Sequence, residues 1–500
     1  MGENKKTKIV KISSGEIAGH LNSDEDVQIF KGIPYAAPPV GPLRFKAPVR
    51  HPDWNGVKEC TEFGKSPIQK DLDHMFDDLW TKEFIVSAHE WSEDCLTMNI
   101  WAPADKKDCP VVLYFFGGGF VSGGSSCEIY DGTTLAKKGV IYITFNHRVG
   151  TLSLFANEDL SSESETKKSG NCDLMDAIFA LKWIKENIHN FGGDSNNVTI
   201  WGQSSGASEV LALSTSKVAK GLFKNVVAMG YNCFVNFSRP WNTTKEAYES
   251  SNNLLKEMNI TLDELKEIDA LELTNNRILD RLIVDGYIVE DKFAPMVRSG
   301  ATNHVSIIMG AVPGDAMMGG LFKLAKPATK EEMLVPMKEF FKDDFDRVCK
   351  IYDVENEEMY SLLGKINKDN LIASQIFFAN ERKKAGASNN TYTYFFTHPM
   401  PGPNSKIYGA FHSAEVPYFM NYFSPLRDGY WTEEDFDFGE YLSDVLVEYF
   451  KTGAIADDAF KYETDTDYSL LDAKDNKVIS FSKEKYEIWV RGYQNQDRDY

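Results

Sequence analysis

Short runs of apolar residues alternate along this chain with segments whose apolar side chains recur at helical spacing, and this alternation restricts the possible folds. Residues 111–116 and 140–145 read as buried strands, residues 173–189 carry apolar side chains every three to four positions, and residues 198–201 form a β-branched strand after a turn at 192–195. Strands that alternate with helices pair in parallel, because a crossover helix returns the chain to begin the next strand in the same direction. The pattern predicts an α/β fold with a large, mostly parallel central sheet and helices on both faces.

Three later apolar runs predict further strands of the same sheet, at residues 224–229, 305–309 and 391–396. The chain has 500 residues, and no internal repeat, low-complexity segment or Pro/Gly/Ser-rich linker divides it. Large α/β folds often use such a length as one domain. We therefore expect a single domain over residues 1–500, with helical insertions at about 245–300 and 328–388 over one end of the sheet.

The chain is acidic, because 54 Lys and Arg residues stand against 74 Asp and Glu residues, a formal net charge of −20. An acidic surface repels phosphate backbones and anionic lipid, so we expect no nucleic-acid partner. No apolar run reaches the length of a membrane-spanning helix, about 18 residues, and residues 1–7 lack the apolar core of a signal peptide. Seven cysteines without close pairing or metal-ligand spacing indicate reduced thiols, and we expect a cytoplasmic protein without a bound metal.

The sequence Gly202-Gln203-Ser204-Ser205-Gly206 comes directly after a predicted strand and before a helical stretch. In this context Gly-x-Ser-x-Gly is typical of a nucleophile elbow, a tight turn that exposes a serine hydroxyl on strained backbone. The glycines are needed because the backbone approaches itself closely in such a turn. We expect Ser204 to be a nucleophile; the alternative is a serine-rich strand-to-helix turn without a chemical role.

Three glycines, Gly117–Gly119, end the first predicted strand and are candidates for binding an oxyanion. Acyl transfer passes through a tetrahedral oxyanion, which N–H donors that are already in place must stabilise. We expect these donors to be the backbone amides of Gly118 and Gly119, together with the amide of Ser205 after the nucleophile. A purely structural glycine turn is the alternative.

Three longer segments carry further signatures, at residues 30–45, 92–101 and 187–206. They read FKGIPYAAPPVGPLRF, SEDCLTMNIW and NIHNFGGDSNNVTIWGQSSG. With these segments the chain resembles the type-B carboxylesterase and cholinesterase family of α/β-hydrolases. The resemblance implies an α/β-hydrolase fold with helical insertions over the active-site end, and hydrolysis of carboxylic esters by an active-site serine without a metal or organic cofactor.

Nine histidines compete for the role of general base. Residues 408–418 look like the family's catalytic-histidine loop, with His412 at the catalytic position. In this fold the triad follows the chain order serine, acid, histidine, so a base far downstream of Ser204 is expected. His147 is the rival, but it stands where the family usually carries an aromatic residue.

Residues 307–315 are similar to the family's acid loop, and Asp315 aligns with the acid of the triad. The family generally has glutamate at this position. Aspartate is shorter by one methylene group, about 1.5 Å along the side chain, so the loop must approach His412 more closely. We expect Asp315 to orient the His412 imidazole; the alternative is that Asp315 only caps its loop.

The resemblance also implies two buried ion pairs, Arg44 with Glu93 and Arg148 with Asp176. We interpret both pairs as structural rather than catalytic.

Three departures from the family pattern bear on the substrate. Gln203 replaces the usual glutamate before the nucleophile, Phe116 replaces a histidine common before the glycines, and Ile85 stands where cholinesterases carry a choline-stacking tryptophan. Without that aromatic face and that carboxylate, cation–π capture of a quaternary ammonium group is poorly supported. We therefore expect uncharged esters rather than choline esters.

The leading hypothesis is a serine carboxylesterase that forms an acyl-enzyme on Ser204 and takes small-molecule esters as substrates. A first alternative is a non-catalytic scaffold or adhesion member of the family, although such relatives usually lose a triad residue and all three positions are filled here. A second alternative is a narrower enzyme such as an amidase, lactonase or lipase, which the sequence does not separate from an esterase. The oligomeric state is left open.

Overall fold

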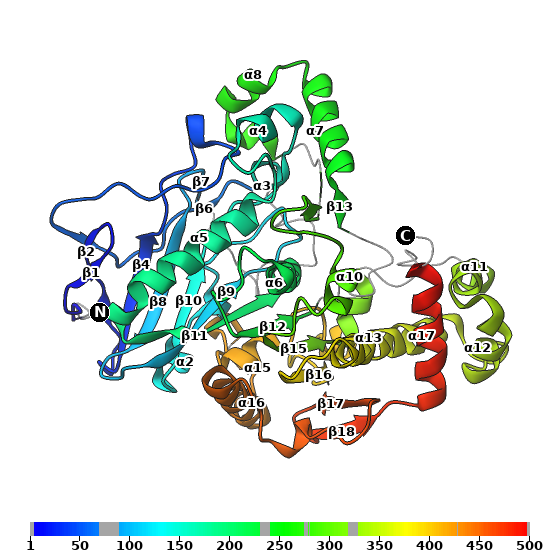
Figure 1. Ribbon diagram of the computed structural model, residues 1–500. Coiled ribbons are helices and arrows are strands. Elements are labelled where there is room, and N and C mark those ends of the chain that lie inside the picture. The colour runs from blue at the N-terminus through cyan, green and yellow to red at the C-terminus, as the bar shows by residue number, and fades with distance from the viewer. Residues whose placement is uncertain are drawn as a thin grey trace.

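The structure is a computed structural model that describes residues 5–69, 90–230, 241–274, 279, 281–318, 329–427 and 429–497. Within this part of the chain an 11-stranded sheet runs through the molecule (Figure 1). Its strands, in spatial order, are β18 (Lys477–Ser480), β17 (Asp467–Leu471), β16 (Thr391–Phe396), β15 (Ser306–Ala311), β12 (Asn225–Met229), β11 (Gly193–Gln203), β9 (Cys109–Phe115), β10 (Ile141–Phe145), β8 (Thr97–Pro103), β4 (Val27–Pro34) and β3 (His20–Leu21).

The middle of this sheet, from β10 to β17, consists of parallel strands, as the alternation of strands and helices predicts. The strands at both edges are antiparallel: β8, β4 and β3 on one side and β18 on the other. Residues 22–26 join β3 to β4, and residues 472–476 join β17 to β18. Connections this short permit only antiparallel pairing. The mostly parallel sheet is therefore confirmed, and its antiparallel edges are an addition that the sequence analysis did not predict.

Each of the six predicted strands is a strand of this sheet. The predicted turn at residues 192–195 is wrong in its extent. Gly192 is left-handed, with φ of 87°, but β11 already begins at Gly193 and pairs there with β9. The register shifts between Gly193 and Val198, so the residues expected in a turn form an irregular start of the strand instead.

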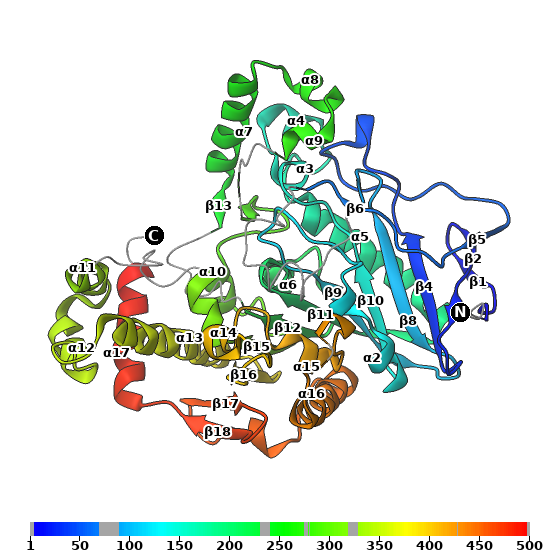
Figure 2. The same cartoon turned by 180° about the vertical axis from the view of Figure 1, so that it is seen from behind.

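Alternate side chains of the central strands enter two separate hydrophobic cores, one on each face of the sheet. In β9, Val111 and Leu113 belong to the first core, whereas Val112 and Tyr114 belong to the second. Figure 1 shows the helices of the first face, which are α5 (Cys172–Asn187), α6 (Ser205–Thr215), α10 (Phe293–Arg298) and α13 (Met359–Lys384). Figure 2 shows those of the second face, which are α2 (Thr133–Lys137), α15 (Val416–Met420) and α16 (Glu433–Thr452).

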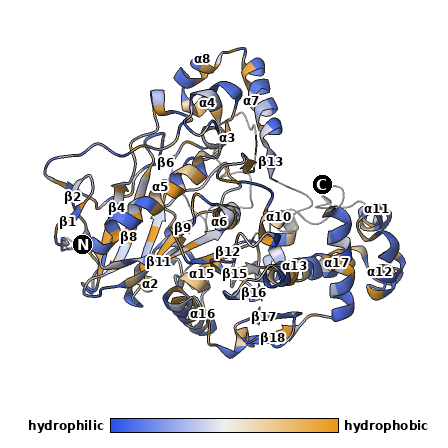
Figure 3. Cartoon of the chain, viewed as in Figure 1, coloured by the Kyte–Doolittle hydropathy of each residue, from blue (hydrophilic) through white to orange (hydrophobic). Residues whose placement is uncertain are grey.

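The other helices lie beyond these layers. A third, leucine-rich core joins α3 (Thr151–Leu154), α4 (Glu158–Glu163), α7 (Thr244–Met258), α8 (Leu262–Glu267) and α9 (Ala270–Leu273). Phe340 and Phe341 of α11 (Lys330–Phe341) pack on Trp489 of α17 (Lys483–Asp497), next to α12 (Phe345–Ile351). The outlying α7 and α17 are mostly hydrophilic (Figure 3). The predicted insertion regions thus hold α7 to α10 and α11 to α13, of which α10 and α13 join the layer on the sheet.

The remaining α-helix and strands of the described chain are short. They are α14 (Ser405–Tyr408) and three minor sheets, made of β1 (Val10–Ile12), β2 (Gly15–Ala18) and β5 (Val57–Glu59), of β6 (Ser66–Pro67) and β7 (Trp91–Ser92), and of β13 (Asn242–Thr243) and β14 (Ile283–Val284).

Candidate active site

Ser204 lies at the sharp turn between β11 and α6. Its backbone has φ of 56° and ψ of −122°, a conformation that non-glycine residues adopt only under strain, at a cost of about 1–3 kcal/mol. The flanking glycines have no room for a side chain. A Cβ atom at Gly202 would lie 2.1 Å from the Gly206 carbonyl oxygen, and one at Gly206 would lie 2.3 Å from the Phe115 carbonyl oxygen. The Gly-x-Ser-x-Gly spacing is therefore a packing requirement of this turn.

The loop Gly117–Gly119 lies directly against the Ser204 turn. A Cβ atom at Gly117 would come within 2.9 Å of the Ser204 Cβ. Gly118 has φ of 134°, and a Cβ there would lie 2.1 Å from the Ser122 carbonyl oxygen. Within the described residues, no hydrogen bond from the backbone N–H of Gly118, Gly119 or Ser205 to another group of the chain is formed. Three backbone donors without a partner in the described chain thus belong to the turn after Ser204 and to the loop that contacts this turn through Gly117.

His412 and Asp315 are in contact. His412 Nδ1 lies 2.5 Å from Asp315 Oδ1, and each side chain is 6% exposed. The second carboxylate oxygen, Oδ2, accepts a 2.8 Å hydrogen bond from the Val312 N–H. Since the acceptor is a carboxylate, the His412 Nδ1 donates its proton, which leaves Nε2 with a lone pair.

Gly314 explains how the short side chain of Asp315 reaches His412. A Cβ atom at Gly314 would lie 2.4 Å from the His412 backbone nitrogen, and the Gly314 N–H donates a 3.0 Å hydrogen bond to the Ala410 carbonyl oxygen. The loop after β15 therefore packs directly on the loop that carries His412. This close approach lets the short aspartate side chain reach the imidazole.

Three neighbouring parallel strands bring these groups together. β11, β12 and β15 pair in register and end at Gln203, Met229 and Ala311, so their carboxyl ends meet at one edge of the sheet. Gly230 follows β12 with φ of 69°, and a Cβ there would lie 3.1 Å from His412 Cε1 and 3.2 Å from Asp315 Oδ1. Gly230 was not predicted as a site residue, although a glycine directly after the predicted strand 224–229 was the available signal.

Gln203 contacts the histidine as well. Its Nε2 lies 3.2 Å from His412 Nε2, and the side chain is buried. Because the Nδ1 proton is directed to Asp315, the amide of Gln203 donates and His412 Nε2 accepts. From the sequence, Gln203 was predicted only to remove a negative charge, and this hydrogen bond was not predicted.

Two further titratable groups, Glu415 and Tyr394, are buried close to Asp315. Burial, together with the negative charge of Asp315, raises the pKa of the Glu415 carboxyl well above its usual range. Burial and the charges of Glu415 and Asp315 raise the pKa of Tyr394 in the same way. A protonated Glu415 avoids repulsion with the Asp315 carboxylate. Glu415 lies inside the predicted histidine loop, 408–418, yet nothing in the pattern distinguished it.

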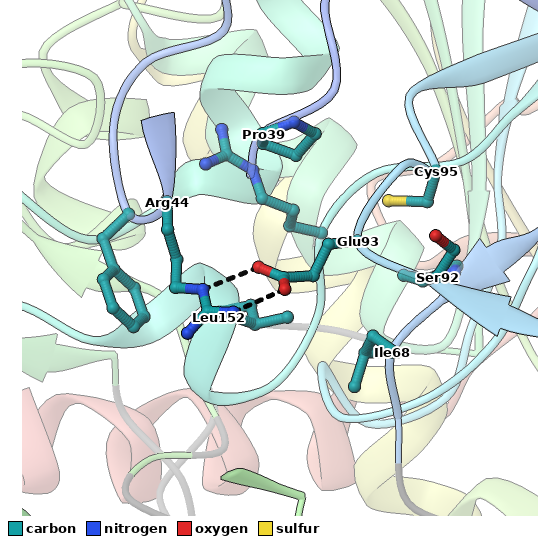
Figure 4. A pocket seen from close by; sticks show the side chains of 10 residues that line it. Pro39, Arg44, Ile68, Ser92, Glu93, Cys95 and Leu152 are labelled. Atoms are coloured by element: carbon teal, nitrogen blue, oxygen red, sulfur yellow. Dashed lines mark hydrogen bonds and ion pairs between the residues drawn. The ribbon is translucent and has the colours of Figure 1, made fainter. Parts of the chain in front are cut away.

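The two predicted ion pairs are present, away from these groups. Arg44 Nε and Nη2 lie 2.7 Å and 2.5 Å from the two carboxylate oxygens of Glu93 (Figure 4), and Arg44 Nη1 donates to two backbone carbonyls at the end of α8. Arg148 Nε and Nη2 lie 2.9 Å and 2.6 Å from the carboxylate oxygens of Asp176. The pocket beside Arg44 is lined by neither Ser204 nor His412. The first pair joins two loops to each other and to the end of α8, and the second joins the loop after β10 to α5.

Three further expectations concern Ile85, a bound metal and a membrane-spanning helix. Ile85 lies outside the described residues. Among the described side chains, no group of three or more His, Cys, Asp and Glu residues is arranged to hold a metal ion. Among the described helices, none combines the length and the apolar character that crossing a membrane requires.

The chain is similar in sequence and in structure to known esterases. The profile of the Carboxylesterase family matches residues 6–498. The chain is 34% identical over 360 residues to fumonisin B1 esterase of Sphingopyxis macrogoltabida, covering 69% of this chain and 62% of that protein. It is 30% identical over 434 residues to para-nitrobenzyl esterase of Bacillus subtilis (strain 168), covering 82% of each chain. A solved structure of PNB esterase superposes with a TM-score of 0.79 at 25% identity, over 96% of this chain and 99% of that one.

Proposed function

The chain belongs to the carboxylesterase family, and we propose that it hydrolyses uncharged carboxylic esters through an acyl-enzyme intermediate on Ser204. Membership gives the chain the α/β-hydrolase fold that its sequence predicted and the activity of a carboxylic-ester hydrolase. One observation carries the proposed mechanism: the Asp315–His412 pair and three uncommitted amides flank a single strained serine turn.

The first half of the reaction acylates the enzyme. Ser204 Oγ attacks the ester carbonyl carbon while His412 Nε2 takes the hydroxyl proton, and Asp315 holds the imidazole through Nδ1. The carbonyl oxygen becomes an oxyanion, which the amides of Gly118, Gly119 and Ser205 stabilise. His412 then gives the proton to the leaving alcohol.

The second half releases the acid. Water attacks the acyl-enzyme carbonyl while His412 accepts the water proton, and the acid leaves as Ser204 regains its hydrogen. Because Nε2 must receive a proton in both halves, the Gln203 amide has to withdraw from it as each transition state forms. Besides the ester and the water, these steps use side chains and backbone amides of this chain.

The preference for uncharged esters is supported by the neutral groups around the serine. Gln203 places an amide, not a carboxylate, against the general base. Phe116, directly before the oxyanion glycines, is a buried apolar ring. Neither side chain offers the negative charge that a cationic alcohol group would need. The amidase, lactonase and lipase alternatives differ in the acyl and leaving groups, which esters, amides and lactones of graded length would separate.

A cytoplasmic location is part of the same proposal. The six described cysteines are free thiols, which fits a reducing compartment.

The test is pre-steady-state hydrolysis of p-nitrophenyl acetate. We expect a burst of p-nitrophenol of about one equivalent per chain. After reaction with a fluorophosphonate, we expect mass spectrometry to find the label on Ser204. Ser204→Ala is expected to abolish both signals. Ser214→Ala is the matched control, since its hydroxyl only bonds to the Leu211 carbonyl oxygen of the same helix. Undiminished turnover in Ser204→Ala would refute the nucleophile, and a wild-type protein without burst or label would favour the scaffold alternative.

A further inference from the structure

Two buried titratable side chains that the proposed mechanism does not use face each other beneath the glycine loop. His147 Nε2 lies 3.6 Å from Glu209 Oε2, and the two side chains are 2% and 1% exposed. In the described part of the chain neither of these atoms has a hydrogen-bond partner. Glu209 belongs to α6, while His147 lies in the loop after β10.

The protonation states of the two groups are complementary. His147 Nδ1 lies 3.1 Å from the Arg148 carbonyl oxygen, so Nδ1 carries the proton and Nε2 is an acceptor. Burial lowers the pKa of His147 to about 4. Burial, and the charges of Asp173 and Asp176, raise the pKa of Glu209 well above its usual range. A neutral carboxylic acid therefore faces a neutral imidazole acceptor, and a shift of a few tenths of an ångström makes a hydrogen bond.

Phe116 connects this pair to the oxyanion glycines. Its ring stacks on the His147 ring, with centroids 4.2 Å apart and planes at 8°. Phe116 directly precedes Gly117–Gly119, and its carbonyl oxygen would lie 2.7 Å from a Cβ atom at Gly206 in the first turn of α6. The imidazole is thus held between the strand end that leads to the oxyanion amides and the helix that carries Ser205.

We propose that Glu209 and His147 are a positioning pair, which fixes Phe116 and the glycine loop against the N-terminus of α6. The inference rests on the proposed function, because it concerns how the oxyanion amides are placed. Those amides act only when they lie about 2.7–3.1 Å from the oxyanion. They come from two segments, and a relative shift of about 1 Å between reacting groups can cost about 100-fold in rate. Glu209 belongs to one of these segments, α6, and His147 contacts the other through the Phe116 ring.

The test separates positioning from mere stability. Glu209→Leu removes the donor, and His147→Phe removes the acceptor while keeping an aromatic ring on Phe116. We expect kcat for p-nitrophenyl acetate to fall about 10- to 100-fold in each, with KM changed less than about threefold. The affinity for an aryl trifluoromethyl ketone, which adds to Ser204 as an oxyanion, is expected to fall in parallel with kcat/KM.

Two further variants complete the test. Glu209→Gln keeps a neutral donor and is expected to stay within about threefold of the wild-type kcat, because only the donor is required. Leu213→Ala, a buried position on the same helix, is the control for lost stability: its melting temperature falls while kcat is unchanged.

Three results would overturn the inference. They are a Glu209→Leu or His147→Phe protein that behaves like the Leu213→Ala control, equal losses in Glu209→Gln and Glu209→Leu, and analogue affinity that does not follow kcat/KM. If Glu209→Leu does not fold, His147→Phe and Glu209→Gln still decide. A wild-type protein without burst or label would instead refute the proposed function itself.

Discussion

Replacing Gln203 by glutamate tests the proposed mechanism most directly, because it changes one charge beside His412, the proposed general base. The change exchanges the amide that lies 3.2 Å from His412 Nε2 for a carboxylate of the same size. At 3.2 Å and an effective dielectric of about 20, an ion pair with a protonated imidazole is worth about 5 kcal/mol. Desolvation of the buried carboxylate opposes this gain. A pKa shift of about 1–3 units is usual for a group this close to an opposite charge.

The sign follows from the role of the base. A carboxylate favours the protonated imidazole, and His412 must be unprotonated to accept the Ser204 proton. We therefore expect the acidic limb of the kcat/KM profile to move upward by about 1–3 pH units in Gln203→Glu, with activity recovered above the new limb.

The assay is kcat/KM for p-nitrophenyl acetate from about pH 4 to 9, which brackets ordinary histidine titration. Gln203→Met is the matched control, since it removes the amide without adding a charge and is expected to leave the limb in place. Because the carboxylate would be buried, added salt is expected to change the shift little. A limb that stays in place or moves downward in Gln203→Glu would refute both the contact and the assigned base.

Three other changes test the acid, the glycine loop and the pH dependence of stability. Asp315→Asn is expected to lower kcat by about 10⁴-fold without changing the melting temperature, since it removes the carboxylate that holds the His412 Nδ1 proton; normal turnover would mean that another carboxylate is the acid. Gly118→Ala is expected to lower kcat by about 100- to 1,000-fold, because its Cβ would overlap the Ser122 carbonyl oxygen. Gly119→Ala has open space around it and adds only about 1–2 kcal/mol of backbone strain. Equal effects of the two changes on turnover would contradict this reasoning. Burial raises the pKa of Asp173 from 3.8 to about 7, so as pH rises this carboxyl ionises in the unfolded chain before it ionises in the folded one. The urea midpoint of unfolding is therefore expected to fall between about pH 4 and 7, and to fall less in Asp173→Asn. An identical fall in the variant would mean that another group causes the effect.

Much of the fold and of the candidate site can be predicted from the sequence. The six predicted strands depend on local apolar runs, and each forms. The strained turn at Ser204 depends on glycines two residues to either side, so five adjacent residues were enough to predict it. The assignments of Asp315 and His412 came from the resemblance, since neither an aspartate in a loop nor one histidine among nine identifies itself.

The sequence alone determined which residue types stand at the strand ends, because hydrophobic periodicity and tight turns depend on neighbours a few positions away. Only the tertiary structure decided which of these groups meet. Asp315 reaches His412 across 97 residues, and Gln203 reaches it across 209. His147 and Glu209 likewise come together from a loop and a helix that are not adjacent in the chain. Such contacts depend on the order of β11, β12 and β15 and on close approaches at Gly230 and Gly314, and sequence spacing does not encode that packing.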